Sequence, residues 1–337
     1  MANVVLTNKC NLKCKYCFAQ ELTKGAAQYF SAENFRKAIK FIKTGAENER
    51  LGIVGGEPTI HPYFGEFIEI INEDKEIKNC IIFTNGIELD KYIDILKSDE
   101  KFSLLINCNS PYDIGNLYNK LENNIKLLAK SGKKRYTLGI NIYSTQMDWE
   151  YIFDLLEITK QHNVRASISV LNKEKIKCHD VIKHLKGYRD TIINFCNDCV
   201  KNEIVPGFEC SSVIPCIADD EFYRVQFKLI ELSKRYKLEH SNIFCGECDS
   251  QVDILPDLTS VRSICYPYYK KHPIRNFRTV NHLRNYFKYE VDNYLPLLHV
   301  SKRCKDCEYK INGQCNICPG YTMKNFMDIS KYILSKS

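Results

Sequence analysis

The chain has 337 residues, of which 44% are hydrophobic and 26% are charged, and its formal net charge is +7. Its Lys and Arg residues are dispersed and form no basic block, so no nucleic-acid partner is expected. It has no signal peptide and no apolar run of about 18 residues, so we expect a cytoplasmic protein that does not cross a membrane. In such a reducing compartment its 17 cysteines are more often metal ligands than disulfides.

Short apolar segments alternate with amphipathic segments over the first 202 residues. The predicted strands are 2–7, 51–54, 80–83, 102–106, 136–143 and 164–171. The predicted helices are 31–42, with Ser31 as its N-cap, and then 64–71, 92–96, 117–129, 149–159 and 181–202. Six strand–helix units of this kind imply parallel strands joined by right-handed crossovers. We therefore predict an α/β fold in which residues 1–202 form a partial (β/α)6 TIM-like barrel.

This alternation stops in the last third of the chain. Residues 203–218 are expected to be irregular, because they contain Pro206 and Gly207, and 221–236 are expected to form one further helix. Two short apolar segments flank a turn and predict a β-hairpin, at 252–255 and 261–265.

The tail beyond residue 240 is rich in cysteine. We predict a bridging region at 203–240 and a small cysteine-rich cluster-binding domain at 241–337. Because this last domain has little apolar pattern of its own, a bound metal would have to stabilise it.

Three thiols follow the first predicted strand within eight residues, at Cys10, Cys14 and Cys17. Thiolates are soft ligands that select iron–sulfur clusters, zinc or copper(I). A 4Fe–4S cluster normally takes four thiolates, so three would leave one iron open to another ligand. The glycine-rich and polar segments Gly55–Pro58 and Thr84–Gly86 end neighbouring strands, so they should lie on the same edge of the sheet as the thiols.

The cysteine loop resembles the cluster motif of the radical S-adenosylmethionine (SAM) superfamily, with Tyr16 as the aromatic residue before the last cysteine. In that family three cysteines hold a 4Fe–4S cluster and SAM chelates the open iron. One electron then cleaves SAM to a 5′-deoxyadenosyl radical, which abstracts a hydrogen atom. The resemblance implies that Cys10, Cys14 and Cys17 are the catalytic cluster ligands. The alternative is a structural zinc site, which would need a fourth ligand, and no Cys or His lies nearby in the sequence.

Gly55-Gly56-Glu57-Pro58 is similar to the family's GGEP motif, which contacts the SAM amino group. The two glycines allow close backbone approach, and Glu57 can accept a charge-assisted hydrogen bond. The alternative is a tight strand-to-helix turn in which Pro58 starts the helix. Thr84-Asn85-Gly86 is similar to the third-strand ending beside the adenosine of SAM.

Polar residues also follow the fourth and fifth strands. Asn107, Asn109, Ser110 and Asn141 either face SAM or substrate or cap their loops. The predicted SAM-binding residues are Tyr16, Gly55, Gly56, Glu57, Pro58, Thr84, Asn85, Asn107 and Asn141.

The C-terminal cysteines resemble the SPASM and twitch extensions of the same superfamily, which hold auxiliary iron–sulfur clusters. The resemblance implies one or two auxiliary 4Fe–4S clusters, with ligands drawn from Cys245, Cys248, Cys265, Cys304, Cys307, Cys315 and Cys318. We assign Cys304, Cys307 and Cys315 to one cluster and the other four cysteines to a second.

This tail departs from the full SPASM pattern, because the spacing of its last four cysteines differs and no cysteine follows Cys318. Two complete clusters need one more thiolate than the tail supplies. Either one iron stays open, or the tail holds a single cluster with spare cysteines, or Cys210 or Cys216 supplies the missing ligand. The alternative is a pair of C-x2-C motifs that bind zinc.

Enzymes with such a tail most often modify ribosomally made peptides. The resemblance therefore implies an oxidoreductase-type peptide maturase that forms a crosslink, a thioether or an oxidised residue. An electron donor such as flavodoxin or ferredoxin would be a partner, and a leader-peptide-binding domain would have to be a separate protein, because the barrel starts at residue 2. The alternatives are a dehydrogenase or mutase acting on a small molecule such as an aminosugar, and a non-catalytic iron–sulfur or zinc protein.

Overall fold

The computed structural model forms two compact units, one of Met1–Leu138 with Ser250–Glu290 and one of Gly139–Asp249 with Val291–Ser337. Among the helices it describes, none is both long and apolar enough to cross a membrane. The residues that the structure describes are 1–17, 19, 22–23, 25–45, 49–97, 100–168, 181–208, 213–239, 251–264, 271–293, 304–312 and 314–315.

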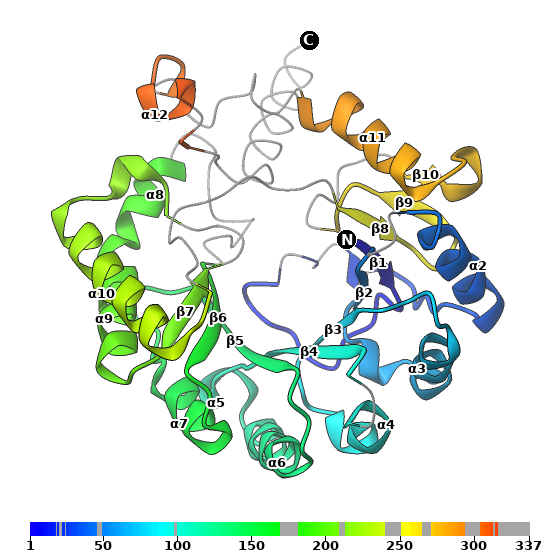
Figure 1. Cartoon of the computed structure of the whole chain (residues 1–337), viewed down its shortest axis with the longest axis horizontal. Coiled ribbons are helices and arrows are strands. Elements are labelled where there is room, and N and C mark those ends of the chain that lie inside the picture. The colour runs from blue at the N-terminus through cyan, green and yellow to red at the C-terminus, as the bar shows by residue number, and fades with distance from the viewer. Residues whose placement is uncertain are drawn as a thin grey trace. The chain divides into compact units, whose positions relative to one another are not determined.

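Parallel strands form the centre of the first unit (Figure 1). They are β1 (Ala2–Val5), β2 (Leu51–Val54), β3 (Cys80–Thr84) and β4 (Phe102–Asn107), and each pairs in parallel with the next. Along β4 the side chains of Phe102, Leu104 and Ile106 are buried, whereas those between them are half-buried. The side chains of β4 therefore alternate between two faces of the sheet, one more deeply buried than the other.

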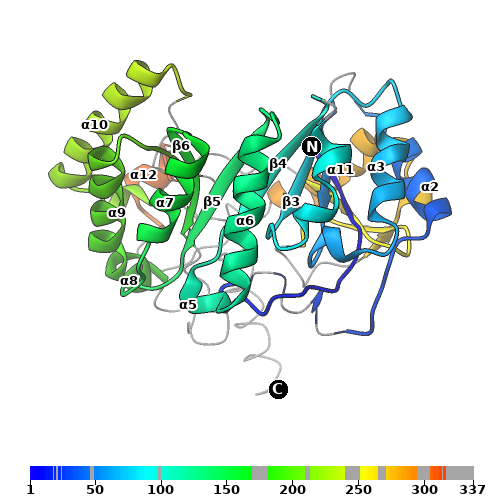
Figure 2. The same cartoon turned by 90° about the horizontal axis from the view of Figure 1, so that it is seen from below.

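The helices of this unit lie on the outer side of its strands in both views (Figures 1 and 2). They are α2 (Ala32–Ile42), α3 (Phe64–Glu73), α4 (Ile93–Lys97), α5 (Pro111–Ile114) and α6 (Leu117–Lys130), with short 3-10 turns at Pro58–Ile60 and Leu89–Lys91. The predicted start of the first helix is confirmed, because Asn34 N donates to Ser31 Oγ at 3.1 Å.

A segment far along the chain extends the same sheet. It comprises β8 (Val252–Ile254), β9 (Thr259–Val261) and β10 (His272–Pro273), followed by a 3-10 turn (Ile274–Asn276) and α11 (Val280–Glu290). The predicted hairpin is confirmed, since β8 and β9 pair in antiparallel fashion, but its second strand lies at Thr259–Val261 and not at 261–265. In addition β8 pairs in parallel with β1, where Asn3 Nδ2 donates to Asp253 Oδ1 at 2.6 Å. The predicted division of the chain into a barrel, a bridging region and a cluster-binding domain stays a prediction.

The second unit also consists of parallel strands and helices. Its strands are β5 (Tyr136–Ile142, which begins in the first unit), β6 (Asn163–Ile168) and β7 (Val205–Phe208). Its helices are α7 (Glu150–Thr159), α8 (Val181–Gly187), α9 (Arg189–Lys201), α10 (Asp220–Tyr236) and α12 (Glu308–Ile311), with a 3-10 turn at Pro215–Ile217.

Strand β7 corrects the prediction that residues 203–218 are irregular throughout. Val205 N donates to His162 O at 2.8 Å, and Pro206 stands opposite Val164 of β6. Pro206 and Gly207 have low strand propensity, so the sequence pattern hid this strand. Because β6 is the only described strand that pairs with β7, the missing N–H of Pro206 leaves no ladder bond broken on its outer side.

Candidate functional site

The cysteine loop continues directly from β1, and the residues after β2 pair with it. Gly56 N donates to Thr7 O, and Glu57 N donates to Lys9 O, both at 2.8 Å. These two segments therefore stay paired beyond the regular strands, up to the residue before Cys10.

Both glycines of this segment are required by that close pairing. A Cβ on Gly55 would lie 2.6 Å from Thr7 O, and one on Gly56 would lie 2.1 Å from Lys9 O. Any larger side chain would push the cysteine loop away. The two glycines thus allow the backbone of the cysteine loop to lie close to them. Their predicted contact with SAM stays a prediction.

Glu57 is buried between the ends of β2 and β3, with 1% of its surface exposed. Its Oε1 accepts from Thr59 N at 3.1 Å, from Thr59 Oγ1 at 2.6 Å and from Thr84 Oγ1 at 2.7 Å. Its Oε2 accepts from Asn85 N at 2.7 Å. Burial raises the pKa of this carboxyl, and the four donors act in the opposite direction. Pro58 starts only a short 3-10 turn.

The end of β3 also holds the cysteine loop directly. Asn85 Nδ2 donates to Asn11 Oδ1 at 2.7 Å, and Asn85 Oδ1 accepts from Ile87 N at 3.0 Å. Gly86 has a φ of +78°, a conformation that favours glycine. Asn124 of α6 fixes this turn by donating to the carbonyls of Gly86 and Ile87.

The end of β4 contacts the other half of the loop. Tyr16 OH donates to Asn109 Oδ1 at 2.5 Å and accepts from Asn107 Nδ2 at 2.9 Å. Cys14 Sγ lies 3.4 Å from the same Asn109 Oδ1, to which it donates. One carboxamide therefore holds both the aromatic residue and a thiol of the motif.

Sequence reasoning did not place Asn109 among the SAM-binding residues. The available signal was its spacing of two from Asn107, which puts both side chains on the same side of an extended chain. Ser110 instead caps α5, because its Oγ accepts from Asp113 N at 3.2 Å. Asn141 lies on β5 in the second unit, and its predicted role stays a prediction.

The thiols of the loop are half-buried. Burial raises the pKa of Cys10 to about 11 and that of Cys14 to about 12, so a bound metal would have to displace their protons. Within the described residues, no three Cys, His, Asp or Glu side chains converge on a position for a single ion. A 4Fe–4S cluster does not require such convergence, because each iron takes its own thiolate. The donor set of the loop therefore fits a cluster.

Of the other described cysteines, four are buried in the core, three belong to the C-terminal tail and Cys216 is exposed. Cys80, Cys108, Cys196 and Cys199 are buried in the core. Of the predicted auxiliary ligands the structure describes Cys304, Cys307 and Cys315, whereas Cys245, Cys248, Cys265 and Cys318 lie outside the described residues.

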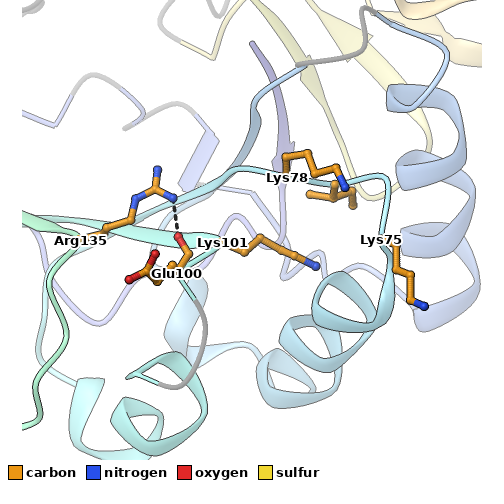
Figure 3. A pocket seen from close by; sticks show the side chains of 6 residues that line it. Lys75, Lys78, Glu100, Lys101 and Arg135 are labelled. Carbon is orange, nitrogen blue, oxygen red and sulfur yellow. Dashed lines mark hydrogen bonds between the residues drawn. The ribbon is translucent and has the colours of Figure 1, made fainter.

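A pocket of about 440 Å³ lies in the first unit at the strand ends opposite to those that carry the cysteine loop. The residues that line it precede β3, β4 and β5 (Figure 3). Lys101 Nζ donates to three carbonyl oxygens at the end of α3, at 2.8 to 3.0 Å. Arg135 donates to Asn79 Oδ1 at 3.1 Å and to the Glu100 carbonyl. None of the predicted site residues lines this pocket, whose walls are Lys75, Ile77, Lys78, Glu100, Lys101 and Arg135.

Comparison with known families and proteins extends these observations. A family model described as the radical SAM superfamily matches residues 4–198, more than half of the chain. GTP 3′,8-cyclase of Synechocystis sp. is 29% identical over 168 residues, which are 47% of this chain and 50% of that protein. A probable GTP 3′,8-cyclase of Methanococcus maripaludis is 38% identical over 93 residues, which are 27% of this chain and 30% of that protein. The chain thus spans half or less of these curated relatives.

Solved structures match over more of the chain. SuiB of Streptococcus suis bound to S-adenosylmethionine has a TM-score of 0.59 at 15% identity, covering 95% of this chain and 75% of that chain. Native anSMEcpe with bound AdoMet has a TM-score of 0.64 at 16% identity, covering 99% of this chain and 97% of that chain. At such identities the likeness concerns the fold, and it confirms the predicted α/β class with a partial TIM-like barrel.

Proposed function

The chain belongs to the radical SAM superfamily, and on this premise we propose that it modifies a ribosomally synthesised peptide, in the manner of an oxidoreductase. The family's cofactors are a 4Fe–4S cluster and SAM, which together supply a 5′-deoxyadenosyl radical for hydrogen abstraction. The observation that carries the peptide substrate is the extent of the fold likeness. Native anSMEcpe with bound AdoMet and Cp18Cys peptide matches 100% of this chain and 97% of its own, with a TM-score of 0.63 at 16% identity.

The residues in and around the cysteine loop would have different roles. Cys10, Cys14 and Cys17 would hold the cluster, and the ends of β3 and β4 would fix the loop through Asn85 and Asn109. Gly55 and Gly56, which follow β2, would allow their backbone to lie close to the residues just before Cys10. These contacts orient the thiols and partly bury them.

The proposed enzyme would have two protein partners besides the peptide. An electron donor such as flavodoxin or ferredoxin would reduce the cluster, and a separate leader-binding protein would present the peptide. The C-terminal cysteines would hold auxiliary clusters that accept the electron released when the new bond forms.

A second candidate substrate is GTP or another small molecule. The observation that favours it is the sequence identity to GTP 3′,8-cyclases, which is higher than the identity to SuiB or anSMEcpe. Its weakness is that the match covers only about half of each chain.

One experiment separates these functions. The full chain is reconstituted anaerobically with iron and sulfide and given dithionite and SAM, together with either GTP or peptides encoded beside its gene. We expect 5′-deoxyadenosine to increase with a peptide, whose mass decreases by loss of hydrogen. Consumption of GTP instead would establish the second candidate, and a cluster-loaded chain that cleaves no SAM would contradict both.

A further inference from the structure

A short extended segment between the cysteine loop and α2, residues 26–30, forms an exposed strand edge in the first unit. We propose that this edge segment binds the substrate peptide by accepting it as an added strand. The inference rests on the proposed function, because an added strand must supply the backbone N–H and C=O groups of a peptide.

The inner side of the edge segment pairs in antiparallel fashion with the residues just after β1. Phe30 N donates to Leu6 O at 3.0 Å. Asn8 N donates to Gln28 O at 3.3 Å, and Gln28 N donates to Asn8 Oδ1 at 2.8 Å. The backbone groups of Gln28 and Phe30 are therefore directed toward the chain that leads into the cysteine loop.

The outer side of the edge segment offers the backbone groups that a strand needs. These groups alternate in direction along an extended chain, so those of Ala27 and Tyr29 point away from β1. Within the described part of the chain, no hydrogen bond involves the backbone N–H or C=O of either residue. Two N–H and two C=O groups at this spacing can pair with a strand of about three residues.

The edge lacks the features that usually protect an exposed strand from pairing. Residues 25–29 read Gly-Ala-Ala-Gln-Tyr, without a charged residue or a proline, and all five are exposed. The small side chains of Ala26 and Ala27 also leave room for another backbone to approach. An edge of this composition is open to a further strand.

The edge segment is also fixed at its far end, by the turn that follows β2. Phe30 is buried, and its carbonyl accepts from His61 Nε2 at 3.1 Å. His61 Nδ1 accepts from Tyr63 N at 3.1 Å. Burial lowers the pKa of the His61 imidazole to about 4, so near pH 7 the ring is neutral and can make both bonds. A preformed edge loses little conformational entropy when a peptide binds.

Two exposed aromatic rings lie beside the edge. The rings of Tyr29 and Tyr63 flank that of His61, with centroid distances of 5.3 and 6.1 Å, and they are 43% and 58% exposed. Side chains directly opposite each other on paired strands share one face of the sheet. We therefore expect the peptide to place an apolar or aromatic side chain opposite Tyr29.

The direction of the edge segment relates the bound peptide to the cysteine loop. Asn8 Nδ2 donates to Ala26 O at 2.7 Å. Lys9 Nζ donates to Gly25 O at 3.1 Å, so the segment begins beside the residues that precede Cys10. An antiparallel strand, the slightly more stable arrangement, would run in the direction of β1. The peptide residues that follow the bound strand would then lie nearest the cysteine loop.

The test uses the full cluster-loaded chain with SAM and fluorescein-labelled, overlapping fragments of the peptides encoded beside its gene. Fluorescence anisotropy gives the Kd of each fragment. Ala27→Pro removes one outward N–H, a change that a strand edge tolerates, and we expect it to raise the Kd of the bound fragment about tenfold. Ala27→Ser keeps this N–H and is the matched control.

A second measurement leaves the protein unchanged. Methylating the backbone nitrogens of the bound fragment one at a time removes one N–H in each case. Only every second N–H of an added strand faces its neighbour, so the Kd should rise at alternate positions. This series decides the question even if circular dichroism shows that Ala27→Pro is unfolded.

The outcomes distinguish the inference from the function on which it rests. Equal Kd values for the wild type and folded Ala27→Pro, or a methylation series without alternation, would overturn the inference. The proposed function would stand, provided that the peptide still increases 5′-deoxyadenosine. A wild-type chain that consumes GTP and binds no fragment would contradict the proposed function and the inference with it. A dimer of the wild type that Ala27→Pro dissociates would assign the edge to a second copy of the chain and overturn the inference alone.

Discussion

Thr84 Oγ1 donates a 2.7 Å hydrogen bond to Glu57 Oε1, and this contact joins the end of β3 to the end of β2. The second carboxylate oxygen accepts from Asn85 N, and Asn85 in turn donates to Asn11 in the cysteine loop. Glu57 therefore positions the loop through Asn85. Its carboxylate is also largely engaged within the protein, which limits what it can offer a ligand.

Replacing Glu57 by Gln should destabilise the protein by about 1–3 kcal/mol, because the amide nitrogen cannot accept and would leave a buried donor unpaired. Urea unfolding followed by circular dichroism measures the change. Glu33→Gln is the control, since it removes an exposed carboxylate that is bonded to Lys37. Equal unfolding midpoints for the two variants would show that the Glu57 contacts do not stabilise the strand ends.

Gly56→Ala should reduce the iron bound at Cys10, Cys14 and Cys17 while leaving the helix content unchanged. The added Cβ would lie 2.1 Å from Lys9 O and 3.0 Å from Cys10 N, so the cysteine loop must move. Iron content per chain is compared in a background that lacks the C-terminal cysteines. Gly187→Ala is the matched control, since nothing lies within 4 Å of its added Cβ. Full iron content in Gly56→Ala would contradict the argument.

The regular elements around the site followed from the sequence because their periodicity is local. Alternation along β4 and the Ser31 cap both depend on residues within a few positions. The pairing of β8 with β1 could not be predicted in this way, because Asn3 and Asp253 lie 250 residues apart. Strand β7 was missed for a different reason, since Pro206 is tolerated only where a strand edge is unpaired.

The residues that form the site were predicted more completely than their roles. The spacing of Cys10, Cys14 and Cys17 identified the loop. The spacing of Asn109 from Asn107 indicated only that both side chains share one side of the chain, and not that Asn109 contacts Cys14. Sequence reasoning treated Glu57 as a ligand-binding group, and the structure adds its bonds to β3. Hydrogen-bond partners depend on how separate strand ends meet, which no local pattern encodes.

Asn109→Ala should lower the reduction potential of the cluster at the cysteine loop. Asn109 lies against Cys14 Sγ, which in a bound cluster is a thiolate that accepts hydrogen bonds. Its carboxamide can then offer an N–H, which stabilises the more negative reduced cluster. EPR-monitored redox titration measures the potential. Asn109→Leu, which is similar in size but has no side-chain N–H, should show the same decrease, and Tyr16→Phe tests the Tyr16 hydroxyl separately. Unchanged potentials in both Asn109 variants would exclude this role.

Asp253 is buried at the junction of β8 and β1, where Asn3 and the backbone N–H of Ile264 donate to it. Burial raises the pKa of its carboxyl from the usual 3.8 to about 6, against the opposing effect of these donors. The folded protein therefore holds this proton more tightly than the unfolded chain. Between those two values the unfolded chain ionises first, so the free energy of unfolding contributed by Asp253 falls as pH rises.

This contribution should decrease by roughly 3 kcal/mol from about pH 4 to about pH 6 and stay constant above that range. Urea unfolding across this range, for the wild type and Asp253→Asn, isolates it, because every other titrating group is common to both. The difference between wild type and variant should shift in favour of the variant as pH rises. Parallel pH profiles would mean that Asp253 titrates alike in the folded and unfolded chains, and that burial at the β1–β8 junction costs its charge nothing.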